Sequence, residues 1–224
     1  FNAFFETASG FTTTGSSVVT DFSSLDHSIM FWRSFAHWIG GMGVLVFILA
    51  IIPESKEGSS IHILRAESPG PQVGKLVSKM RVTSRILYLI YLILTIILIL
   101  ILWLGPDKKM DLFNSMIYSF GTAGTGGFGI DNGSLETYAR STQYIIPTFM
   151  LIFGINFSMF YLILIGNLKE VFRNEELRSF LIIVAVSVLF ITFTVYFKFK
   201  DTLQAMTFEE SFRHSYFQVA SIIS

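Results

Sequence analysis

FNAFFETASGFTTTGSS, residues 1–17, and FNSMIYSFGTAGTGGFG, residues 113–129, are the stretches that decide the fold. Each is an apolar run too short to cross the roughly 30 Å of hydrocarbon in a bilayer, and each leads into a Gly/Thr segment that disfavours regular structure. Laid over each other without gaps, they coincide at Phe1/Phe113, Asn2/Asn114, Thr13/Thr125 and Gly15/Gly127. The start of a third copy is predicted at an offset of 212, where Phe217, Ala220 and Ser221 repeat Phe5, Ala8 and Ser9.

The composition is that of an integral membrane protein. Hydrophobic residues make up 52% of the 224 residues and charged residues only 14%, whereas soluble domains average roughly 45–50% and about 25%. The formal net charge is zero, which gives no indication of a nucleic acid or another polyanionic partner. The absence of cysteine excludes disulfides and thiolate metal sites.

Four segments are long and apolar enough to cross a bilayer, which takes about 20 helical residues. They are Ile29–Ile52, Val82–Leu104, Tyr144–Gly166 and Ser179–Phe197. Polar connections and the half-length segments alternate between them. We therefore predict an all-α integral membrane fold built from repeated helix–pore loop–helix units around a central pore, and a fragment of a four-repeat, potassium-channel-like fold.

The distribution of Lys and Arg predicts the orientation. Nine basic residues lie in or beside segments 53–81 and 167–178, against about six on the opposite side, and this modest bias favours the cytoplasm for both segments. The half-length segments then enter from the outer side and return. The expected organisation is the end of a first repeat in 1–52, a cytoplasmic loop in 53–81, a complete second repeat in 82–166, a cytoplasmic link in 167–178 and the start of a third repeat in 179–224. The chain is thus expected to be an internal fragment of a larger protein.

The Gly/Thr segments have the composition of a cation filter. A short helix that ends inside the membrane directs the negative end of its dipole towards the pore. An extended segment after it can turn backbone carbonyls inward to replace the hydration shell of a cation, and Gly15 and Gly127 permit the positive φ that this requires. Neither segment contains a carboxylate, which favours a monovalent ion over a divalent one. The alternative is that both segments are external turns.

Five segments along the chain form a recognisable set: GFTTTGSSV, FWRSFAHWIGGMGVLVFILAIIP, RAESPGP, TGGFG and FMLIFGINFSMFYLILIGN. They resemble the TrkH/TrkG potassium-transporter branch of the superfamily that also includes KtrB and HKT. The resemblance implies a four-repeat potassium pore, multi-pass in the bacterial inner membrane and assembled as a homodimer. It also implies a TrkA-like cytosolic nucleotide-binding regulatory subunit as partner. No nucleotide motif occurs in this chain, so we expect no cofactor on it and K⁺ only as the transported ion.

The resemblance implies two filter segments and the start of a third. The filter residues that would present oxygens to K⁺ are Thr12, Thr13, Thr14, Gly15, Gly124, Thr125, Gly126 and Gly127. Ser224 corresponds to Thr12, so the rest of the third filter and the fourth repeat are expected beyond these residues. Each filter retains one aligned glycine, and fewer fixed carbonyls predict that K⁺ and Rb⁺ pass well while Na⁺ is not fully excluded.

Two charged residues are candidates for supporting the first filter. Glu6 lies inside the first short helix, where it either adds negative potential behind the filter or accepts hydrogen bonds from filter amides. Arg33 lies four residues before His37 on one helix face and could anchor the filter loop. The alternative, which the sequence alone favours, is that Arg33 snorkels to the outer interface. For His37 we expect an interior hydrogen bond rather than a pH switch.

Two groups of residues should perturb the spanning helices. Gly40, Gly41 and Gly43 form a small-residue cluster that favours close helix packing over a hinge. Pro147 and the Gly154/Asn156 pair are expected to kink the third span or to provide an interhelical hydrogen bond, with a gate hinge as the less favoured alternative.

Two other classes of function compete with a potassium pore. An ion-coupled secondary transporter of a small solute also contains broken helices and repeats, but its repeats are often inverted, whereas both complete loops here are predicted to enter from one side. An intramembrane enzyme is disfavoured because Ser34 and His37 have no recognisable orienting acid or oxyanion motif, and the sequence contains no HExxH. The sequence therefore predicts monovalent cation permeation, gated by a cytosolic partner, and no enzymatic activity.

Overall fold

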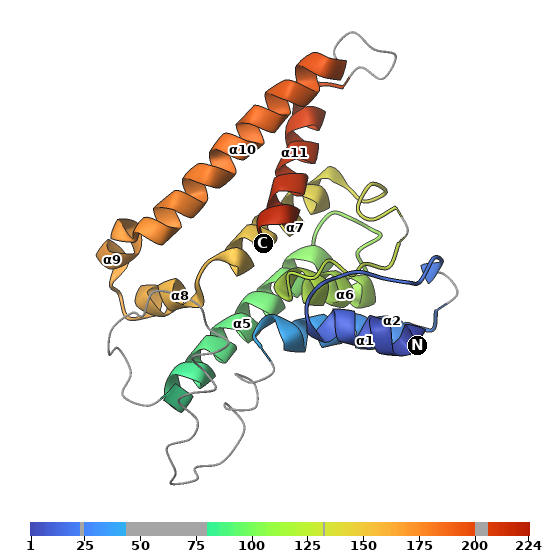
Figure 1. Ribbon diagram of the computed structural model, residues 1–224, viewed down its shortest axis with the longest axis horizontal. Coiled ribbons are helices and arrows are strands. Elements are labelled where there is room, and N and C mark those ends of the chain that lie inside the picture. The colour runs from blue at the N-terminus through green and yellow to red at the C-terminus, as the bar shows by residue number, and fades with distance from the viewer. Residues whose placement is uncertain (23–24, 44–79, 132, 200–205) are drawn as a thin grey trace.

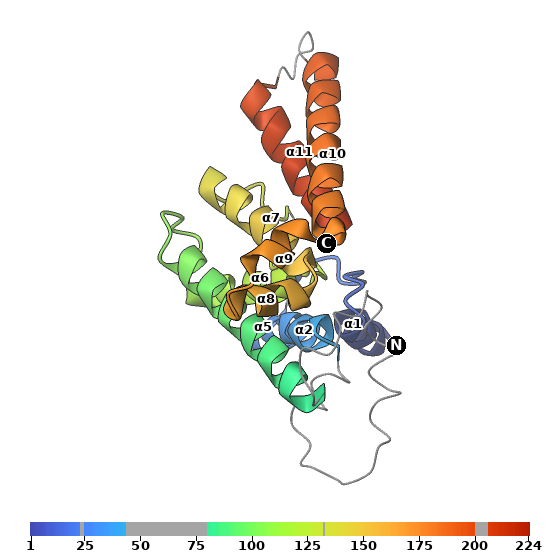
Figure 2. The ribbon, with the colours of Figure 1, turned by 90° about the vertical axis from the view of Figure 1, so that its left-hand side faces the viewer.

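The computed structural model describes residues 1–22, 25–43, 80–131, 133–199 and 206–224. Throughout these ranges the regular structure is helical. The helices α1, α2, α5 and α6 cluster at one end of the molecule, and α10 and α11 lie side by side at the other, with α7 and α8 between them (Figures 1 and 2). The all-α prediction is confirmed for the described part of the chain.

Three helices lead into the aligned segments of the predicted repeats. They are α1 (Asn2–Phe11), α6 (Leu112–Ala123) and α11 (Phe208–Ile223). Asp111 caps α6 by accepting a hydrogen bond from the amide of Asn114, and a capping box between Thr207 and Glu210 starts α11. At about 1.5 Å per residue, the 10 and 12 residues of α1 and α6 cover only about half of a bilayer core.

Within the described ranges, two helices are long and apolar enough to cross a membrane, and a bent pair makes a third if it is counted as one span. The two are α5 (Met80–Trp103) and α10 (Glu175–Phe199), which agree with the predicted spans 82–104 and 179–197. The first predicted span begins as α2 (His27–Gly41), while its remainder and most of the predicted loop 53–81 lie outside the described residues.

The third predicted span is broken rather than gently kinked. It forms α7 (Arg140–Gly154) and α8 (Phe157–Leu164), whose axes differ by 87°. Pro147 lies inside α7, which continues through it, so the break occurs at the second of the two expected positions. Ile155 is extended there, and the Asn156 side chain starts the new helix by accepting a hydrogen bond from the amide of Ser158.

The predicted link 167–178 is also more regular than expected. Its first half forms a short helix, α9 (Leu168–Arg173), and α10 already begins at Glu175. The Oδ1 of Asn174 accepts a hydrogen bond from the Leu177 amide at 2.9 Å, and this cap at the start of α10 explains why the spanning helix begins earlier than its apolar run.

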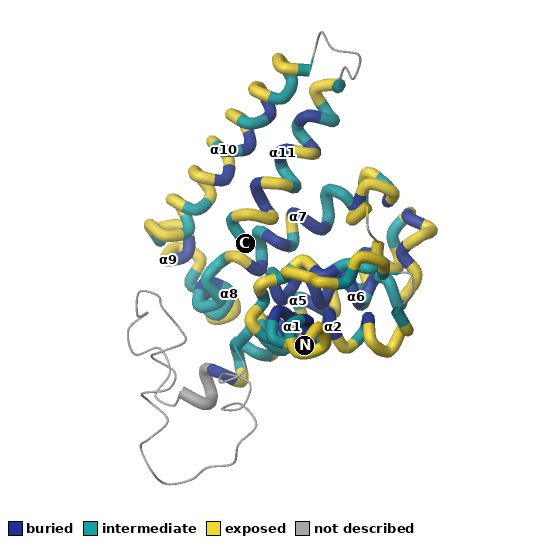
Figure 3. The backbone as a smooth tube through the Cα atoms, turned by 45° about the vertical axis from the view of Figure 1, so that its right-hand side comes forward, coloured by how far each residue is buried: buried dark blue, intermediate teal, exposed yellow. Residues whose placement is uncertain are grey.

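An aromatic core joins the second helix of one repeat to the first helix of the next. Trp38 on α2 stacks on Tyr91 of α5 at 5.4 Å between ring centroids, and its Nε1 donates to Thr95 at 3.0 Å. The Tyr91 hydroxyl donates to the backbone carbonyl of Trp38 at 2.9 Å. Figure 3 shows the buried stretches gathered where α2, α5 and α6 meet. Along α10, buried and exposed positions alternate instead, and the exposed side chains are largely apolar, as on a lipid-facing helix.

The connection between α5 and α6 is held by one buried carboxylate. Asp107 Oδ2 accepts hydrogen bonds from the Ala139 amide at 2.6 Å and the Thr142 hydroxyl at 2.9 Å, while Oδ1 accepts one from the Lys109 amide at 3.1 Å. Burial works to raise the pKa of Asp107, but these hydrogen bonds outweigh it and hold the pKa below its ordinary value of 3.8. This carboxylate therefore ties the loop before α6 to the start of α7.

Candidate functional site

The first Gly/Thr segment begins as a Schellman cap on α1. The Thr12 amide donates to Ala8 O at 2.9 Å, the Thr13 amide to Gly10 O at 3.0 Å and the Thr14 amide to Ser9 O at 3.0 Å. Thr13 has a φ of 55° and Gly15 a φ of 74°, so positive and negative φ values alternate after the cap. The chain thus leaves the helix as a non-helical segment, as the sequence predicts.

The second segment repeats this geometry 112 residues later. The amides of Gly124, Thr125 and Gly126 donate to the carbonyls of Phe120, Thr122 and Gly121, at 2.9, 3.1 and 3.1 Å. Thr125 has a φ of 53° and Gly127 a φ of 81°. The third copy begins in the same way, because the Ser224 amide donates to Ala220 O at 3.1 Å. The repeat inferred from four matched residues is therefore also a repeat of backbone conformation.

Threonine is an unusual residue at the left-handed position of a helix cap. Glycine is the common choice there, because a Cβ in this conformation costs about 1–2 kcal/mol. Both Thr13 and Thr125 adopt it nevertheless, at equivalent positions. Strain repeated at one position indicates that the side chain contributes something glycine would not supply.

The two segments touch each other. A Cβ atom added to Gly15 would lie 1.7 Å from the carbonyl oxygen of Gly126, so the backbones meet where a side chain would not fit. Gly124 is seated in the same way against α2, because a Cβ added there would lie 2.3 Å from the His37 carbonyl oxygen. The structure thus brings the two predicted filter segments into direct contact.

The remaining filter candidates are partly accessible. Thr12, Thr14 and Gly127 are exposed, and Thr13, Thr125 and Gly126 are half-buried. The Thr12 hydroxyl donates to Ala8 O at 2.8 Å and lies 2.9 Å from the Thr14 hydroxyl. Oxygen atoms therefore line the first segment on the side open to solvent or to further repeats.

Behind the first segment lies a buried ion pair. Glu6 Oε2 accepts a hydrogen bond from Arg33 Nε at 2.8 Å, and Glu6 Oε1 accepts hydrogen bonds from the Ser17 hydroxyl at 2.8 Å and the Val18 amide at 2.7 Å. Arg33 Nη2 also donates to Ser17 Oγ at 3.1 Å. The Arg33 side chain is 5% exposed, so the prediction that it snorkels to the interface is wrong. Glu6 gives Arg33 an interior partner, and together they hold the chain just after the first Gly/Thr segment.

The same face of α2 also holds the second segment. Phe128, directly after Gly127, lies with its ring 4.2 Å from the guanidinium carbon of Arg33 and 3.9 Å from the His37 ring, at an interplanar angle of 21°. Gly126 also lies against the His37 ring, because a Cβ added to Gly126 would be 2.4 Å from the imidazole. Sequence reasoning missed Phe128, and its only signal was an aromatic residue directly after the aligned glycine.

His37 is completely buried, but it is not held as expected. Neither ring nitrogen makes a hydrogen bond of ordinary length and angle, although the Ser9 backbone lies near enough to interact with the ring. The stack on Phe128 and the contact with Gly126 replace the interior hydrogen bond that the sequence suggested.

The glycines of α2 serve close packing. A Cβ on Gly40 would lie 2.3 Å from the Phe11 carbonyl oxygen, and a Cβ on Gly41 would lie 2.6 Å from the Cα of Gly124. The first glycine therefore lies against the end of α1, and the second lies against the start of the second Gly/Thr segment. Packing, the favoured explanation of this cluster, fits both contacts.

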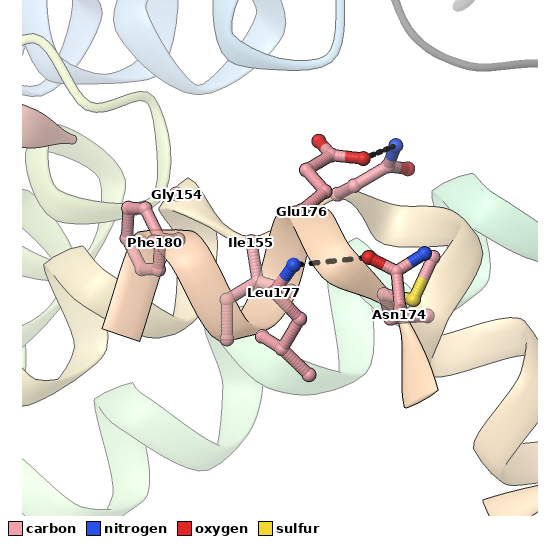
Figure 4. A pocket seen from close by; sticks show the side chains of 8 residues that line it. Gly154, Ile155, Asn174, Glu176, Leu177 and Phe180 are labelled. Carbon is pink, nitrogen blue, oxygen red and sulfur yellow. Dashed lines mark hydrogen bonds between the residues drawn. The ribbon is translucent and has the colours of Figure 1, made fainter. Parts of the chain in front are cut away.

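A corresponding contact occurs at the break between α7 and α8. A Cβ on Gly154 would lie 3.5 Å from the Cα of Ser224, the first residue of the third segment. A small cavity of about 50 Å³ adjoins this elbow, lined by residues that include Gly154, Asn174, Glu176 and Phe180 (Figure 4). The break thus lies beside the start of the third copy.

The described residues contain no group of three or more His, Cys, Asp or Glu side chains that could hold a metal ion. The oxygens of residues 12–15 and 124–127 themselves are backbone carbonyls and threonine hydroxyls. Such neutral ligands suit a monovalent cation that gives up its water readily.

Comparisons with known proteins show which family the chain resembles. The family model of TrkH, described as a cation transport protein, matches residues 1–222. The chain is 35% identical over 224 residues to the Trk system potassium uptake protein TrkH of Escherichia coli strain K12, covering 99% of this chain and 45% of that protein. It is 30% identical over 226 residues to the Trk system potassium uptake protein TrkG of the same strain, covering 100% of this chain and 45% of that protein.

The fold is similar to the crystal structure of the potassium transporter TrkH from Vibrio parahaemolyticus. The TM-score is 0.77 with 28% sequence identity, and the likeness covers 99% of this chain and 43% of that chain. The chain therefore spans less than half the length of these relatives.

Proposed function

Because the chain belongs to the TrkH family of cation transport proteins, we propose that it forms part of a pore for potassium uptake. Its relatives are named as potassium uptake proteins, and its own segments Thr12–Gly15 and Gly124–Gly127 have the backbone features of a cation filter. In this proposal, carbonyl and hydroxyl oxygens of these eight residues replace the water around K⁺. Glu6 and Arg33 support the first segment.

The observation that carries the proposal is the contact between the two segments. They are 112 residues apart, share one cap geometry, and meet at Gly15 and the Gly126 carbonyl oxygen. External turns, the alternative weighed from the sequence, have no reason to repeat a strained threonine and then pack against each other. Two copies of a filter segment around one axis would do both.

The repeated sense of the two units favours a pore over a solute transporter. Each unit runs from short helix to Gly/Thr segment to second helix in the same order, with α1 followed by α2 and α6 followed by α7. Secondary transporters often relate their halves by inversion instead.

The whole protein would act as a multi-pass protein of the bacterial inner membrane. The Trk-system names of the relatives support a multicomponent uptake system, and we propose a homodimer gated by a TrkA-like cytosolic nucleotide-binding subunit. Nucleotide would then bind to that subunit, and this chain would contribute K⁺ ligands only.

Growth of a bacterium that lacks its own potassium uptake systems tests the proposal. The full-length gene should restore growth at limiting K⁺, and Gly15→Ser and Gly127→Ser should both impair it, to different degrees, while the protein still reaches the membrane. Gly15→Ser meets both a positive φ and the Gly126 oxygen, whereas Gly127→Ser meets only the positive φ, since nothing lies within 4 Å of an added Cβ there. Gly15→Ser should therefore be the more severe variant.

Gly133→Ser is the matched control, because a Cβ at Gly133 also meets nothing within 4 Å and this glycine has no positive φ. It should support normal growth. Normal growth with both filter variants would remove the filter from the proposal. Rescue that required a solute other than K⁺ would favour the secondary transporter.

A further inference from the structure

Phe128 is clamped by the preceding repeat. This residue is 4% exposed, and its ring contacts two side chains one turn apart on α2: the Arg33 guanidinium carbon at 4.2 Å and the His37 imidazole at 3.9 Å. A cation over a ring face and a stacked ring both orient an aromatic side chain. Phe128 itself directly follows Gly127, so its position fixes where the second filter segment ends.

The backbone of Phe128 is fixed as well. A Cβ added to Gly121 on α6 would lie 2.6 Å from the Phe128 carbonyl oxygen, so this residue rests closely on its own short helix. A Cβ on Gly10 of α1 would lie 3.8 Å from the Phe128 ring. Phe128 thus contacts elements of both repeats at once.

The residues of the Glu6–Arg33 ion pair behind the first segment are not repeated at the aligned positions of the second. At the offset of 112, Glu6 corresponds to Tyr118 and Arg33 corresponds to Ile145. Phe128, in turn, corresponds to Ser16, which is exposed. Among the described residues, no second ion pair takes the place of Glu6 and Arg33 behind the second segment, and Arg33 contacts this segment through Phe128.

We propose that Phe128, held by Arg33 and His37, is a positioning residue that sets the spacing between the two filter segments and thereby the discrimination between K⁺ and Na⁺. This inference rests on the proposed function. A site of neutral oxygens distinguishes the two ions by the number of oxygens and the distance at which they are held. Loosening the second segment relative to Gly15 lets those oxygens approach a smaller ion.

The test uses the full-length protein reconstituted in liposomes, with uptake of Rb⁺ as the signal and Na⁺ as the competitor. Phe128→Leu keeps an apolar side chain but removes the flat face that Arg33 and His37 hold. We expect Na⁺ to compete at least about threefold more effectively than in the wild type, because the oxygen cage is less rigid. Phe128→Met serves as a second ring-free variant if Phe128→Leu does not reach the membrane.

Two variants separate positioning from a general loss of packing. Phe128→Tyr keeps the flat ring that Arg33 and His37 contact and adds only a hydroxyl group. It should retain the wild-type ratio. Phe193→Leu changes an exposed aromatic residue on α10 and should leave the ratio unchanged.

Loss of discrimination in the ring-free variant with retention in Phe128→Tyr supports the proposal. An unchanged Rb⁺/Na⁺ ratio in the ring-free variant overturns it, as does an equal loss in Phe128→Tyr. If the wild-type protein itself takes up no Rb⁺, the proposed function fails, and that outcome is distinct from both.

Discussion

The Cα of Gly15 lies against the carbonyl oxygen of Gly126, so that a Cβ at residue 15 would be 1.7 Å from that oxygen. This contact joins two segments that belong to successive repeats. It leaves no space for a side chain, and the φ of 74° at Gly15 independently favours glycine. A displacement of either segment is therefore transmitted directly to the other.

Gly41→Ala should impair the second filter segment although residue 41 lies on α2. The added methyl group would be 2.6 Å from the Cα of Gly124 and 2.7 Å from the Tyr91 hydroxyl, and the backbone would have to move. We expect Rb⁺ uptake by the full-length protein to fall about tenfold or more. Gly154→Ala, whose methyl would make an ordinary contact 3.5 Å from Ser224, is the control and should retain most uptake.

Replacing the strained threonines by glycine should separate stability from selectivity. Thr13→Gly and Thr125→Gly remove a left-handed Cβ, which relieves strain, but glycine also loses more backbone entropy on folding, which offsets part of that gain. The free energy of unfolding should therefore stay unchanged or rise by up to about 1 kcal/mol. Both variants lack a hydroxyl that we propose as a K⁺ ligand, and Na⁺ should compete better for Rb⁺ uptake.

Ser134→Gly is the control for this pair of variants, because Ser134 has a φ of 52° but lies outside both filter segments. It should show the same effect on stability with no change in ion competition. Unchanged competition in both threonine variants would show that the hydroxyls do not contribute to the site.

Breaking the buried ion pair should be costly. Glu6→Gln or Arg33→Gln leaves one charge buried without its partner, which typically costs about 3–5 kcal/mol. The double variant should lose less than the sum of the two, as expected for residues in direct contact. Thermal unfolding of the purified full-length protein measures this double-mutant cycle, and strict additivity would contradict the pairing.

The exposed pair Arg140 and Glu209 provides the comparison. Its atoms are 3.8 Å apart and the two side chains are 71% and 41% exposed, so Arg140→Gln should cost less than about 1 kcal/mol.

Asp107 should make the loop between α5 and α6 sensitive to acid. Its pKa is lower in the folded protein than the ordinary 3.8, so the folded state binds this proton less readily than the unfolded state. The stabilisation is present above about pH 4 and is lost as the pH falls through the folded-state pKa. Asp107→Asn should cost about 1–3 kcal/mol near pH 7, because an amide NH₂ group would face a hydrogen-bond donor.

Thermal unfolding between pH 7 and pH 3 checks this prediction, since Asp107→Asn should remove part of the acid-dependent loss seen in the wild type. Asp111→Asn is a suitable control, because asparagine caps a helix about as well as aspartate and should retain the interaction with the Asn114 amide. A wild-type slope that persists in Asp107→Asn would assign the acid sensitivity to another group.

The sequence best predicts the features that depend on local residue patterns. The half-length helices, the spans α5 and α10, and the positive φ of Gly15 and Gly127 all follow from hydropathy, length and the permissiveness of glycine. The conformation of Thr13 and Thr125 did not follow, because threonine disfavours the left-handed region and only the surrounding cap imposes it.

The sequence also does not reveal which residues distant in the chain contact each other in the fold. The sequence alone favours Arg33 at the membrane interface, and only the fold brings Glu6, 27 residues away, within 2.8 Å of it. The role of Phe128 depends on α2 of the preceding repeat, which no local pattern reveals. At Ile155 the sequence predicts a kink, whereas the structure has an 87° break. The reason is that Asn156 caps a new helix, which can take a new direction instead of continuing the old one with a bend.

The most direct test is a crystal structure of the full-length protein grown with Rb⁺ in place of K⁺, using anomalous scattering to locate the ion. We predict a peak at coordination distance from oxygens of Thr12–Gly15 and Gly124–Gly127, on the axis that these segments share. A peak elsewhere in the protein, with none beside these segments at Rb⁺ concentrations that support uptake, would contradict the proposed filter.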